Sequence, residues 1–359
     1  MMVGSEAIRP YDRTHLSKGY LTGKTELERL PLRAPEHYRD LAIELELGRR
    51  VVGVDVAARR ALLDGGQELE WGALLLATGG EPRQLPLPGL EGALYLREIA
   101  DSDQLRAELR GGGRISIVGA GFIGCEVAAA ARELGVEVDL YERFEQPLER
   151  VLGRELGAFY ADLHRSHGVH LHLGVEQLPK LDRPQLAAVG MQPRDGLAVE
   201  AGLLVDAGVL VDATGQTSTP GVYAAGDVAR YFSPTFGSHV RVEHFQTAQH
   251  HGFAVGRSMA GQRGPFTDVP WFWSDQYGHN LQYAGAGLAW DRIVERGRIG
   301  DPPFTVFYLL ADRLLAAAAV DDPRTLSRAR RLIELGISPP AGVLADPVSD
   351  LKALGRLGT

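Results

Sequence analysis

The stretch that decides the fold is Arg114-Ile-Ser-Ile-Val-Gly119-Ala-Gly121-Phe-Ile-Gly124, which leads through a helical run to Val138-Asp-Leu-Tyr-Glu142. It contains an apolar strand, a glycine turn, a helix, and a second strand that ends in an acid. That order of parts is typical of a dinucleotide-binding βαβ unit. Gly119 permits the tight turn, Gly121 lets the backbone approach a pyrophosphate, and Gly124 lets the helix pack close to the strand.

The same stretch predicts which dinucleotide is bound. The helix N-terminus supplies free N–H groups and partial positive charge to the phosphates, so Ala120, Phe122 and Ile123 join the predicted site. Glu142 is placed to accept both hydroxyls of an adenosine ribose and would repel a 2′-phosphate, which favours NAD over NADP. Arg143 follows directly and moderates that preference. The alternative is a βαβ turn without a ligand.

Length and composition limit the class of protein. The chain has 359 residues, which suggests two or three domains, and 45% of them are hydrophobic. A net charge of −8, from 38 basic and 46 acidic residues, argues against nucleic acid as the main partner. The sequence shows no transmembrane-length apolar run and no signal peptide, so we expect a cytoplasmic protein.

The sequence contains one cysteine, Cys125. A single cysteine cannot form an internal CxxC disulfide, which excludes the chemistry of thioredoxin reductase and lipoamide dehydrogenase. Cys125 lies in the first turn of the dinucleotide helix, where the pKa of a thiol can fall. We expect it to be a small packing residue instead.

Apolar runs and turn residues predict the other elements. A hairpin with its turn at Asp64-Gly65 lies between two expected strands, and Asp101 or Ser102 is expected to cap a helix that runs to about residue 109. Residues 178–195 are expected to be irregular. Strands are expected at 51–55, 73–77, 169–173, 208–212, 271–274, 304–310 and 314–319, and helices at 153–166, 243–259 and 323–335.

Several landmarks occur in an order that resembles a known family. They are Pro10-Tyr-Asp-Arg13-Thr-His-Leu-Ser-Lys18, Ala77-Thr-Gly-Gly-Glu-Pro-Arg83, 119–124 with Glu126, Tyr223-Ala-Ala-Gly-Asp227, Arg241-Val-Glu243-His244 and Trp271-Phe-Trp273-Ser-Asp275-Gln. Together they resemble the FAD-dependent, NADH-oxidising ferredoxin reductases. That group serves ring-hydroxylating dioxygenases, cytochrome P450 systems and rubredoxins, and is related to apoptosis-inducing factor.

The resemblance implies a fold and an activity. The fold is α/β, with two Rossmann-like nucleotide-binding domains and a C-terminal α+β domain. Residues 1–97 and 191–264 would form the FAD domain, 98–190 the NAD domain, and 265–359 the C-terminal domain. NADH would reduce FAD, and the electrons would pass to a ferredoxin or rubredoxin carrier.

The resemblance also implies residue roles. Glu6 would bind a ribose, Arg83 the FAD phosphates or adenosine, Asp227 the ribityl chain, and His244 and Trp273 would border the isoalloxazine. Lys18, paired with Glu126, and Trp273 would act at the reaction centre. The implied FAD residues are Ser5, Glu6, Arg13, Lys18, Val52, Ala77, Thr78, Arg83, Gly226, Asp227, His244, Phe245 and Trp273. Gly190 and Glu243 would join the NAD site.

Each role has a plainer alternative. Asp227 could be a turn residue, Arg13 and Lys18 a solvated basic pair, and Trp273 a core side chain. His164, His167, His170 and His172 resemble a metal cluster, but no carboxylate or cysteine completes a ligand set, so we expect packing and surface roles. Arg324, Arg328 and Arg331 form one helix face, which is either a docking surface for an acidic carrier or a solvated face.

The chain departs from the family pattern at its start. The family opens with its own GxGxxG, whereas this sequence begins Met-Met-Val-Gly-Ser-Glu6. We expect a translation start assigned too late, so that the FAD domain is incomplete. The stretch 178–190 is also shorter than the family pattern. A flavin-free NAD(H)-binding or redox-sensing module is therefore the alternative function. An NADH oxidase or peroxidase is disfavoured because it needs a reactive cysteine in the FAD domain.

Overall fold

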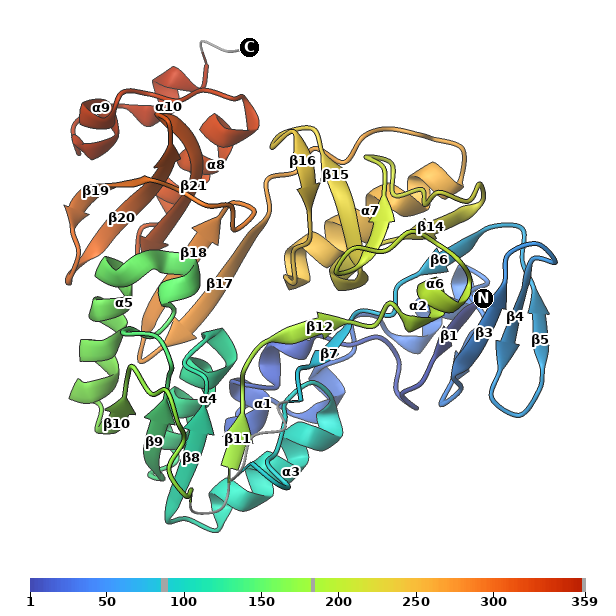
Figure 1. Cartoon of the computed structure of the whole chain (residues 1–359), viewed down its shortest axis with the longest axis horizontal. Helices are drawn as coiled ribbons and strands as arrows, with labels where there is room; N and C mark the ends of the chain where they lie inside the picture. Colours follow the sequence, from blue (N-terminus) through green and yellow to red (C-terminus); the bar gives the residue numbers. More distant parts are fainter. Residues whose placement is uncertain (85–89, 182–184, 357–359) are drawn as a thin grey trace. The chain divides into compact units, whose positions relative to one another are not determined.

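The computed structural model describes residues 1–84, 90–181 and 185–356, and the chain forms two compact units (Figure 1). Unit 1 contains Met1–His15, Gly23–Glu81 and Gln192–Phe266. Unit 2 contains Leu16–Thr22, Pro82–Met191 and Thr267–Thr359. Both mix helices with sheets, which confirms the predicted α/β class.

The first part of unit 2 is a parallel sheet with the strand order β10-β9-β8-β11. Its strands are β8 (Arg114–Val118), β9 (Glu137–Tyr141), β10 (Val169–His172) and β11 (Gln185–Ala187). Its helices are α3 (Ile99–Arg110), α4 (Phe122–Glu133) and α5 (Glu149–Ser166), and the short α1 (Gly19–Thr22) packs against α3 and α4. Because α4 connects two parallel neighbours, β8 and β9, the predicted βαβ unit is confirmed.

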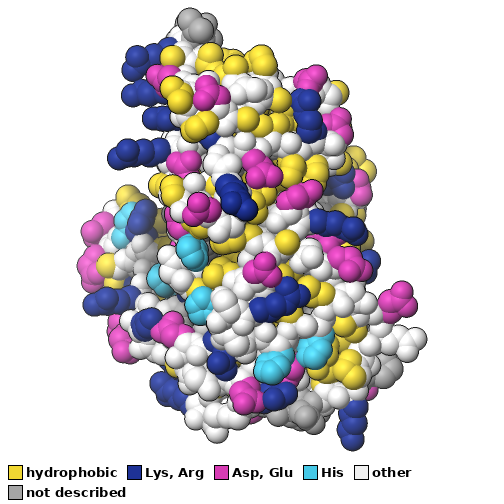
Figure 2. Space-filling view, turned by 90° about the vertical axis from the view of Figure 1, so that its left-hand side faces the viewer, with side chains coloured by type: hydrophobic (Ala, Val, Ile, Leu, Met, Phe, Trp, Pro, Cys, Tyr) yellow, Lys and Arg dark blue, Asp and Glu magenta, His cyan; other side chains and the backbone are white. Residues whose placement is uncertain are grey.

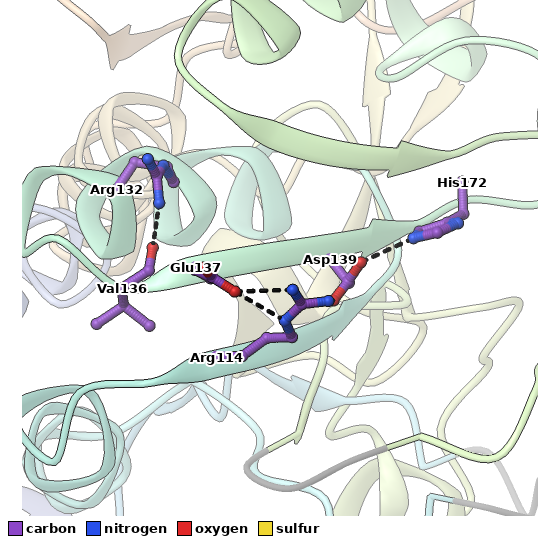
Figure 3. A network of polar contacts seen from close by, with 6 residues as sticks. All are labelled: Arg114, Arg132, Val136, Glu137, Asp139 and His172. Carbon is purple, nitrogen blue, oxygen red and sulfur yellow. Dashed lines mark hydrogen bonds and ion pairs between the residues drawn. The ribbon is translucent and has the colours of Figure 1, made fainter.

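A ladder of charged side chains crosses this sheet (Figure 3). Arg114 on β8 pairs with Glu137 at 2.7 Å and with Asp139 at 2.9 Å, both on β9. The second carboxylate oxygen of Asp139 lies 2.9 Å from Nε2 of His172 on β10. Alternate residues of a strand point to one face, so the ladder joins three strands in a single register.

Two local expectations were wrong. Residues 178–195, which were expected to be irregular, contain β11 and β12 (Met191–Pro193). These strands could not be predicted, because a three-residue strand gives no detectable period in the sequence. Helix α3 is capped by Glu98 in a capping box with Asp101, rather than by Asp101 or Ser102. The helix expected at 153–166 is present as the main part of α5, which starts at Glu149 and is interrupted at Gly153 with a φ of 83°.

The second part of unit 2 is an antiparallel sheet with the order β17-β18-β21-β20-β19. The strands are β17 (Trp271–Gln276), β18 (His279–Ala284), β19 (Arg292–Arg298), β20 (Asp301–Leu310) and β21 (Arg313–Val320). Helix α8 (Pro323–Glu334) covers it, followed by α9 (Ala341–Ala345) and α10 (Leu351–Leu354) (Figure 1). The predicted C-terminal α+β arrangement is confirmed.

Unit 1 is built from small sheets. They are the parallel pairs β1-β2 and β14-β6, the meander β3-β4-β5, and β13-β15-β16. Their bounds are β1 (Met2–Gly4), β2 (Leu45–Leu47), β3 (Val51–Asp55), β4 (Arg60–Leu63), β5 (Glu68–Glu70), β6 (Leu74–Leu76), β13 (Val209–Val211), β14 (Val222–Ala224), β15 (Ala229–Ser233) and β16 (Ser238–Val240). The hairpin expected at Asp64-Gly65 is confirmed.

The helices of unit 1 are short apart from α7. They are α2 (Pro35–Asp40), α6 (Gly196–Glu200) and α7 (Phe245–Met259), with 3-10 turns at Arg13–His15, Leu27–Arg29 and Gly226–Val228. Strands β7 (Gly80–Pro82) and β12 pair at the points where the chain passes between the units. None of the helices in the described part of the chain has both the length and the apolar character needed to cross a membrane.

Candidate nucleotide and electron-transfer site

The three glycines of the dinucleotide turn lie in different surroundings. A Cβ on Gly119, whose φ is 100°, would lie 2.3 Å from the carbonyl oxygen of Ala188, and one on Gly124 would lie 1.9 Å from that of Gly119. Packing alone therefore requires glycine at both positions. Gly121 has a φ of −76°, and a Cβ there would meet no heavy atom within 4 Å. Neither packing nor backbone angle requires glycine at Gly121, and the close approach of a pyrophosphate there stays a prediction.

Helix α4 begins without a side-chain cap. Gly121 is the N-cap residue, and no acid lies in the first turn. The amides of Phe122, Ile123 and Gly124 precede the first intrahelical bond, which Cys125 donates to the Gly121 carbonyl. Such an end attracts phosphate through its N–H groups and its dipole.

The Glu142 carboxylate is fixed beside this turn. One oxygen accepts the Ala120 amide at 2.7 Å, and the other accepts the Phe144 amide at 3.0 Å. An ionised carboxylate has about four acceptor positions, so roughly two remain for ribose hydroxyls. The Arg143 guanidinium lies over the Phe144 ring, 5.0 Å from its centre.

Gly190 lies in an open part of the same unit. Its φ is 104°, and a Cβ there would meet no heavy atom within 4 Å. The Arg83 amide donates to the Gly190 carbonyl at 2.9 Å, and Nε of Arg83 donates to the Met191 carbonyl at 3.1 Å. The structure therefore joins Arg83 to the Gly190 segment, and its predicted contact with FAD phosphates stays a prediction.

Glu126 is a buried carboxylate with three donors. Oε2 lies 2.8 Å from Nζ of Lys18 and accepts the Ser17 hydroxyl at 2.5 Å. Oε1 accepts the Ser274 hydroxyl at 2.6 Å. The side chain is only 5% exposed, so an unpaired charge there would be costly. The ion pair that the resemblance implies is present, and its role in catalysis stays a prediction.

Trp273 lies on β17 with its side chain on the face opposite to Ser274. It is half-buried, and its ring centre lies 5.8 Å from that of Trp271. The strand alternation therefore leaves Trp273 outside the face that is packed against α4.

In unit 1, the predicted ribose-binding acid and one predicted basic residue form a pair. Glu6 makes an ion pair with Arg13 and accepts the Tyr11 hydroxyl at 2.7 Å. The Arg13 guanidinium also donates to the Tyr11 oxygen at 2.6 Å. Arg13 is therefore an ion-paired group instead of a freely solvated one.

The other predicted residues of unit 1 gather around α7 and two strand ends. Gly226, with a φ of 75°, precedes Asp227 in a 3-10 turn, and the Gly226 amide donates to Nδ1 of His251 at 3.4 Å. Helix α7 starts at Phe245, and its N-cap residue His244 provides no side-chain cap. Burial lowers the pKa of His244 to about 4, so its imidazole is neutral at pH 7.

An unpartnered hydroxyl at this helix end fits a bound polar group. In the described part of the chain, Oγ1 of Thr247 in the first turn of α7 is buried without a hydrogen-bond partner. The uncapped first turn and this hydroxyl suit the polar edge of a flavin. Thr78 donates to the Arg194 carbonyl at 2.6 Å, and Glu243 pairs with Arg241 at 2.5 Å. Ser5 and Val52 are exposed, and Ala77 follows β6.

Cys125 and two of the discounted histidines make contacts within the protein. Cys125 is fully buried, burial raises the pKa of its thiol, and the thiol lies 3.4 Å from the Ala120 carbonyl. His164 is buried, and His167 stacks on Tyr277. Within residues 1–84, 90–181 and 185–356, no three His, Cys, Asp or Glu side chains are arranged to hold a metal ion.

Two site residues were missed by sequence reasoning. Ser17 precedes Lys18, and Ser274 shares a face of β17 with Phe272 and lies directly after Trp273. Ser274 could have been found from the alternation of side chains along the strand, because that alternation places its hydroxyl on the buried face.

Comparison with known proteins agrees with this geometry. The model of the pyridine nucleotide-disulphide oxidoreductase family matches residues 1–178 and 185–252, and that of the reductase C-terminal family matches residues 271–355. The ferredoxin–NAD(+) reductase component of an anthranilate 1,2-dioxygenase system from Burkholderia cepacia is 38% identical, over 98% of this chain and 92% of that protein. Putidaredoxin reductase from Pseudomonas putida is 33% identical, over 98% and 90%.

Solved structures give the same result. The putidaredoxin reductase–putidaredoxin complex superposes with a TM-score of 0.93 at 33% identity, over 99% of this chain and 91% of that one. NADH:rubredoxin oxidoreductase from Clostridium acetobutylicum, at 20% identity and a TM-score of 0.80, shares the fold over 99% and 92%. The chain belongs to the pyridine nucleotide-disulphide oxidoreductase family, with the reductase C-terminal domain that follows it in this group.

Proposed function

We propose that this protein is a flavoprotein oxidoreductase that passes electrons from NADH through FAD to a ferredoxin- or rubredoxin-type carrier. The observation that carries the proposal is the open turn at Gly121, which lies between an uncapped helix end and the fixed Glu142 carboxylate. These parts bind a dinucleotide and select a free ribose. The ferredoxin reductases that match over nearly the whole chain support the activity.

FAD, when bound, supplies hydride acceptance and one-electron release. In unit 1, Glu6, Arg13, Asp227 and the first turn of α7 would hold it. The family resemblance assigns Lys18 and Trp273 to the same cofactor, and Glu126 pairs with Lys18 at 2.8 Å. The sequence has a single cysteine, so the electrons would leave the flavin without passing through an internal disulfide.

A basic surface on the C-terminal domain supports the choice of an acidic carrier. Arg324, Arg328 and Arg331 on α8 line a hollow together with Lys352 and Arg356, and none of the described residues that line it is acidic. Figure 2 shows several Lys and Arg side chains near the top of the view. Because the whole chain carries −8, this local reversal of sign favours docking of a negatively charged protein.

Charge reversal tests this docking surface. Arg324→Glu with Arg328→Glu should raise the KM for an acidic ferredoxin at low salt and should leave the KM for NADH unchanged. Arg110→Glu, an exposed arginine on α3, is the matched control. An unchanged ferredoxin KM in the double variant would reject the surface.

We further propose the organisation and location that the sequence suggested. Residues 1–97 and 191–264 would form the FAD domain, 98–190 the NAD domain and 265–359 the C-terminal domain. Apoptosis-inducing factor would be a more distant relative. The protein would work in the cytoplasm, which suits its one buried, reduced cysteine.

Purification with added FAD tests the proposed function. A yellow protein that reduces an acidic ferredoxin at the expense of NADH supports it. A colourless protein that still binds NADH supports the flavin-free module instead.

A further inference from the structure

A line of hydrogen bonds runs from the Glu126 carboxylate into the protein interior. Ser274 donates to Oε1 of Glu126 at 2.6 Å, and Nε2 of Gln276 donates to the Ser274 oxygen at 3.1 Å. Oε1 of Gln276 lies 3.0 Å from Nε2 of His164. Nδ1 of His164 lies 2.9 Å from the Tyr277 hydroxyl. We call Ser274, Gln276, His164 and Tyr277 the relay.

Strand alternation and two helices hold the relay together. Phe272, Ser274 and Gln276 share the buried face of β17. The Phe272 ring meets the Phe122 ring of α4 edge to face at 4.6 Å, one turn before Glu126. His164 projects from α5 and is fully buried. Packing therefore fixes each member at hydrogen-bond distance from the next.

The relay has one direction. Gln276 gives its N–H group to Ser274, so its carbonyl oxygen must accept from His164. His164 then carries its proton on Nε2, and Nδ1 accepts from Tyr277. Burial lowers the pKa of His164 to about 4 and raises the pKa of Tyr277, so one ring is neutral with a single N–H and the other keeps its hydroxyl proton.

This direction decides what Ser274 can do. A serine hydroxyl has one proton, and its oxygen already accepts from Gln276. The proton is therefore left for the Glu126 carboxylate, which can only accept. A reversed Gln276 amide would present its oxygen to Ser274 and compete with Glu126 for that proton, and it would require the Nδ1–H tautomer of His164, because an Nε2–H group would then face the amide N–H group.

We propose that Ser274 is a positioning residue for the Lys18–Glu126 pair, and that Gln276, His164 and Tyr277 fix the direction of its hydrogen bond. Ser274 holds Oε1 of Glu126, which leaves Oε2 to Lys18 and Ser17. It lies next to Trp273 in β17, so the same hydroxyl ties that strand to Lys18. The inference rests on the proposed function only where it gives the pair a part in the reaction.

Lysine labelling measures how firmly Glu126 holds the Lys18 ammonium, and it does not require a bound flavin. The sequence contains four lysines, Lys18, Lys24, Lys180 and Lys352, so mass spectrometry after brief acetylation resolves each one. Lys24 is exposed and serves as the internal reference. Ser274→Ala should raise the Lys18-to-Lys24 rate ratio by roughly threefold to tenfold, because the carboxylate that holds the ammonium loses a charge-assisted bond.

Two further variants separate positioning from general loosening. Ser274→Thr restores the hydroxyl and should restore the ratio. Thr305, on β20 of the same sheet, is also fully buried, and its hydroxyl donates to the Asp322 carboxylate at 3.1 Å. Thr305→Val removes that hydroxyl and should leave the Lys18-to-Lys24 ratio unchanged. A ratio unaffected by Ser274→Ala, or raised equally by Thr305→Val, would overturn the proposal.

Nitrogen-15 NMR of the histidine side chains tests the direction. His164, assigned through the signal lost in His164→Gln, should show the Nε2–H tautomer at pH 7, and an Nδ1–H tautomer would contradict the relay. In the flavin-loaded protein, Ser274→Ala should lower kcat and leave the KM for NADH unchanged. Failure of the proposed function would show separately, as an unaltered chain that does not oxidise NADH.

Discussion

Replacing Glu142 by alanine should weaken NADH binding about 100-fold. The carboxylate uses one position of each oxygen on the Ala120 and Phe144 amides, so about two acceptor positions remain for ribose hydroxyls. A hydrogen bond to a charged group contributes about 1.5–3 kcal/mol, which puts two of them at about 3–6 kcal/mol. Glu142 is half-buried, so we take the lower end, about 3 kcal/mol, which corresponds to about two powers of ten in Kd.

Fluorescence titration with NADH measures this change. Glu137→Gln is the matched control, because it neutralises a carboxylate of the same strand that pairs with Arg114 away from the turn. It should leave the Kd unchanged. Loss of the Glu142 charge should also narrow the preference for NADH over NADPH, since the repulsion of a 2′-phosphate disappears. A Kd that rises less than about threefold in Glu142→Ala would refute the assignment of the ribose acid.

Three other predictions follow from buried groups and from the glycine turn. Gly121→Ala should leave the unfolding free energy nearly unchanged and weaken NADH binding, whereas Gly124→Ala should destabilise the fold, because its Cβ would lie 1.9 Å from the Gly119 carbonyl; urea unfolding and NADH titration of both variants distinguish the two roles. Cys125 should resist thiol reagents in the native state and react after unfolding, since burial raises its pKa, and fast labelling of the native protein would contradict this. Burial lowers the pKa of His251 to about 4, so the unfolded chain binds one more proton than the folded chain once the pH falls below about 6.5. This difference should lower the free energy of unfolding by about 2–3 kcal/mol between pH 7 and pH 4.5. His251→Phe should remove that part of the acid sensitivity in urea unfolding, and an identical pH dependence in both proteins would contradict the assignment.

The geometry of the predicted dinucleotide turn could be derived from the sequence because it is local. Gly119, Gly121, Gly124 and Glu142 lie within or directly after one βαβ unit, which the structure confirms. The structure adds that the three glycines are not needed for the same reason, since of the three Gly121 alone lies in open space.

The relay could not be predicted, because its members come from distant parts of the chain. His164 on α5 reaches Gln276 and Tyr277 only in the folded chain, and Glu126 on α4 reaches Ser274 of β17 in the same way. A hydroxyl or a histidine in isolation carries no directional signal in a sequence. Strand β11 was missed for a related reason: its three residues gain their place by pairing with β8 and have no period of their own.

The most direct test of the central claim is an anaerobic single turnover. One equivalent of NADH should bleach the visible absorbance of the FAD-loaded protein, and an oxidised acidic ferredoxin added next should restore it. A protein that takes up FAD but keeps its colour with NADH, or that stays bleached when the carrier is added, would contradict the account.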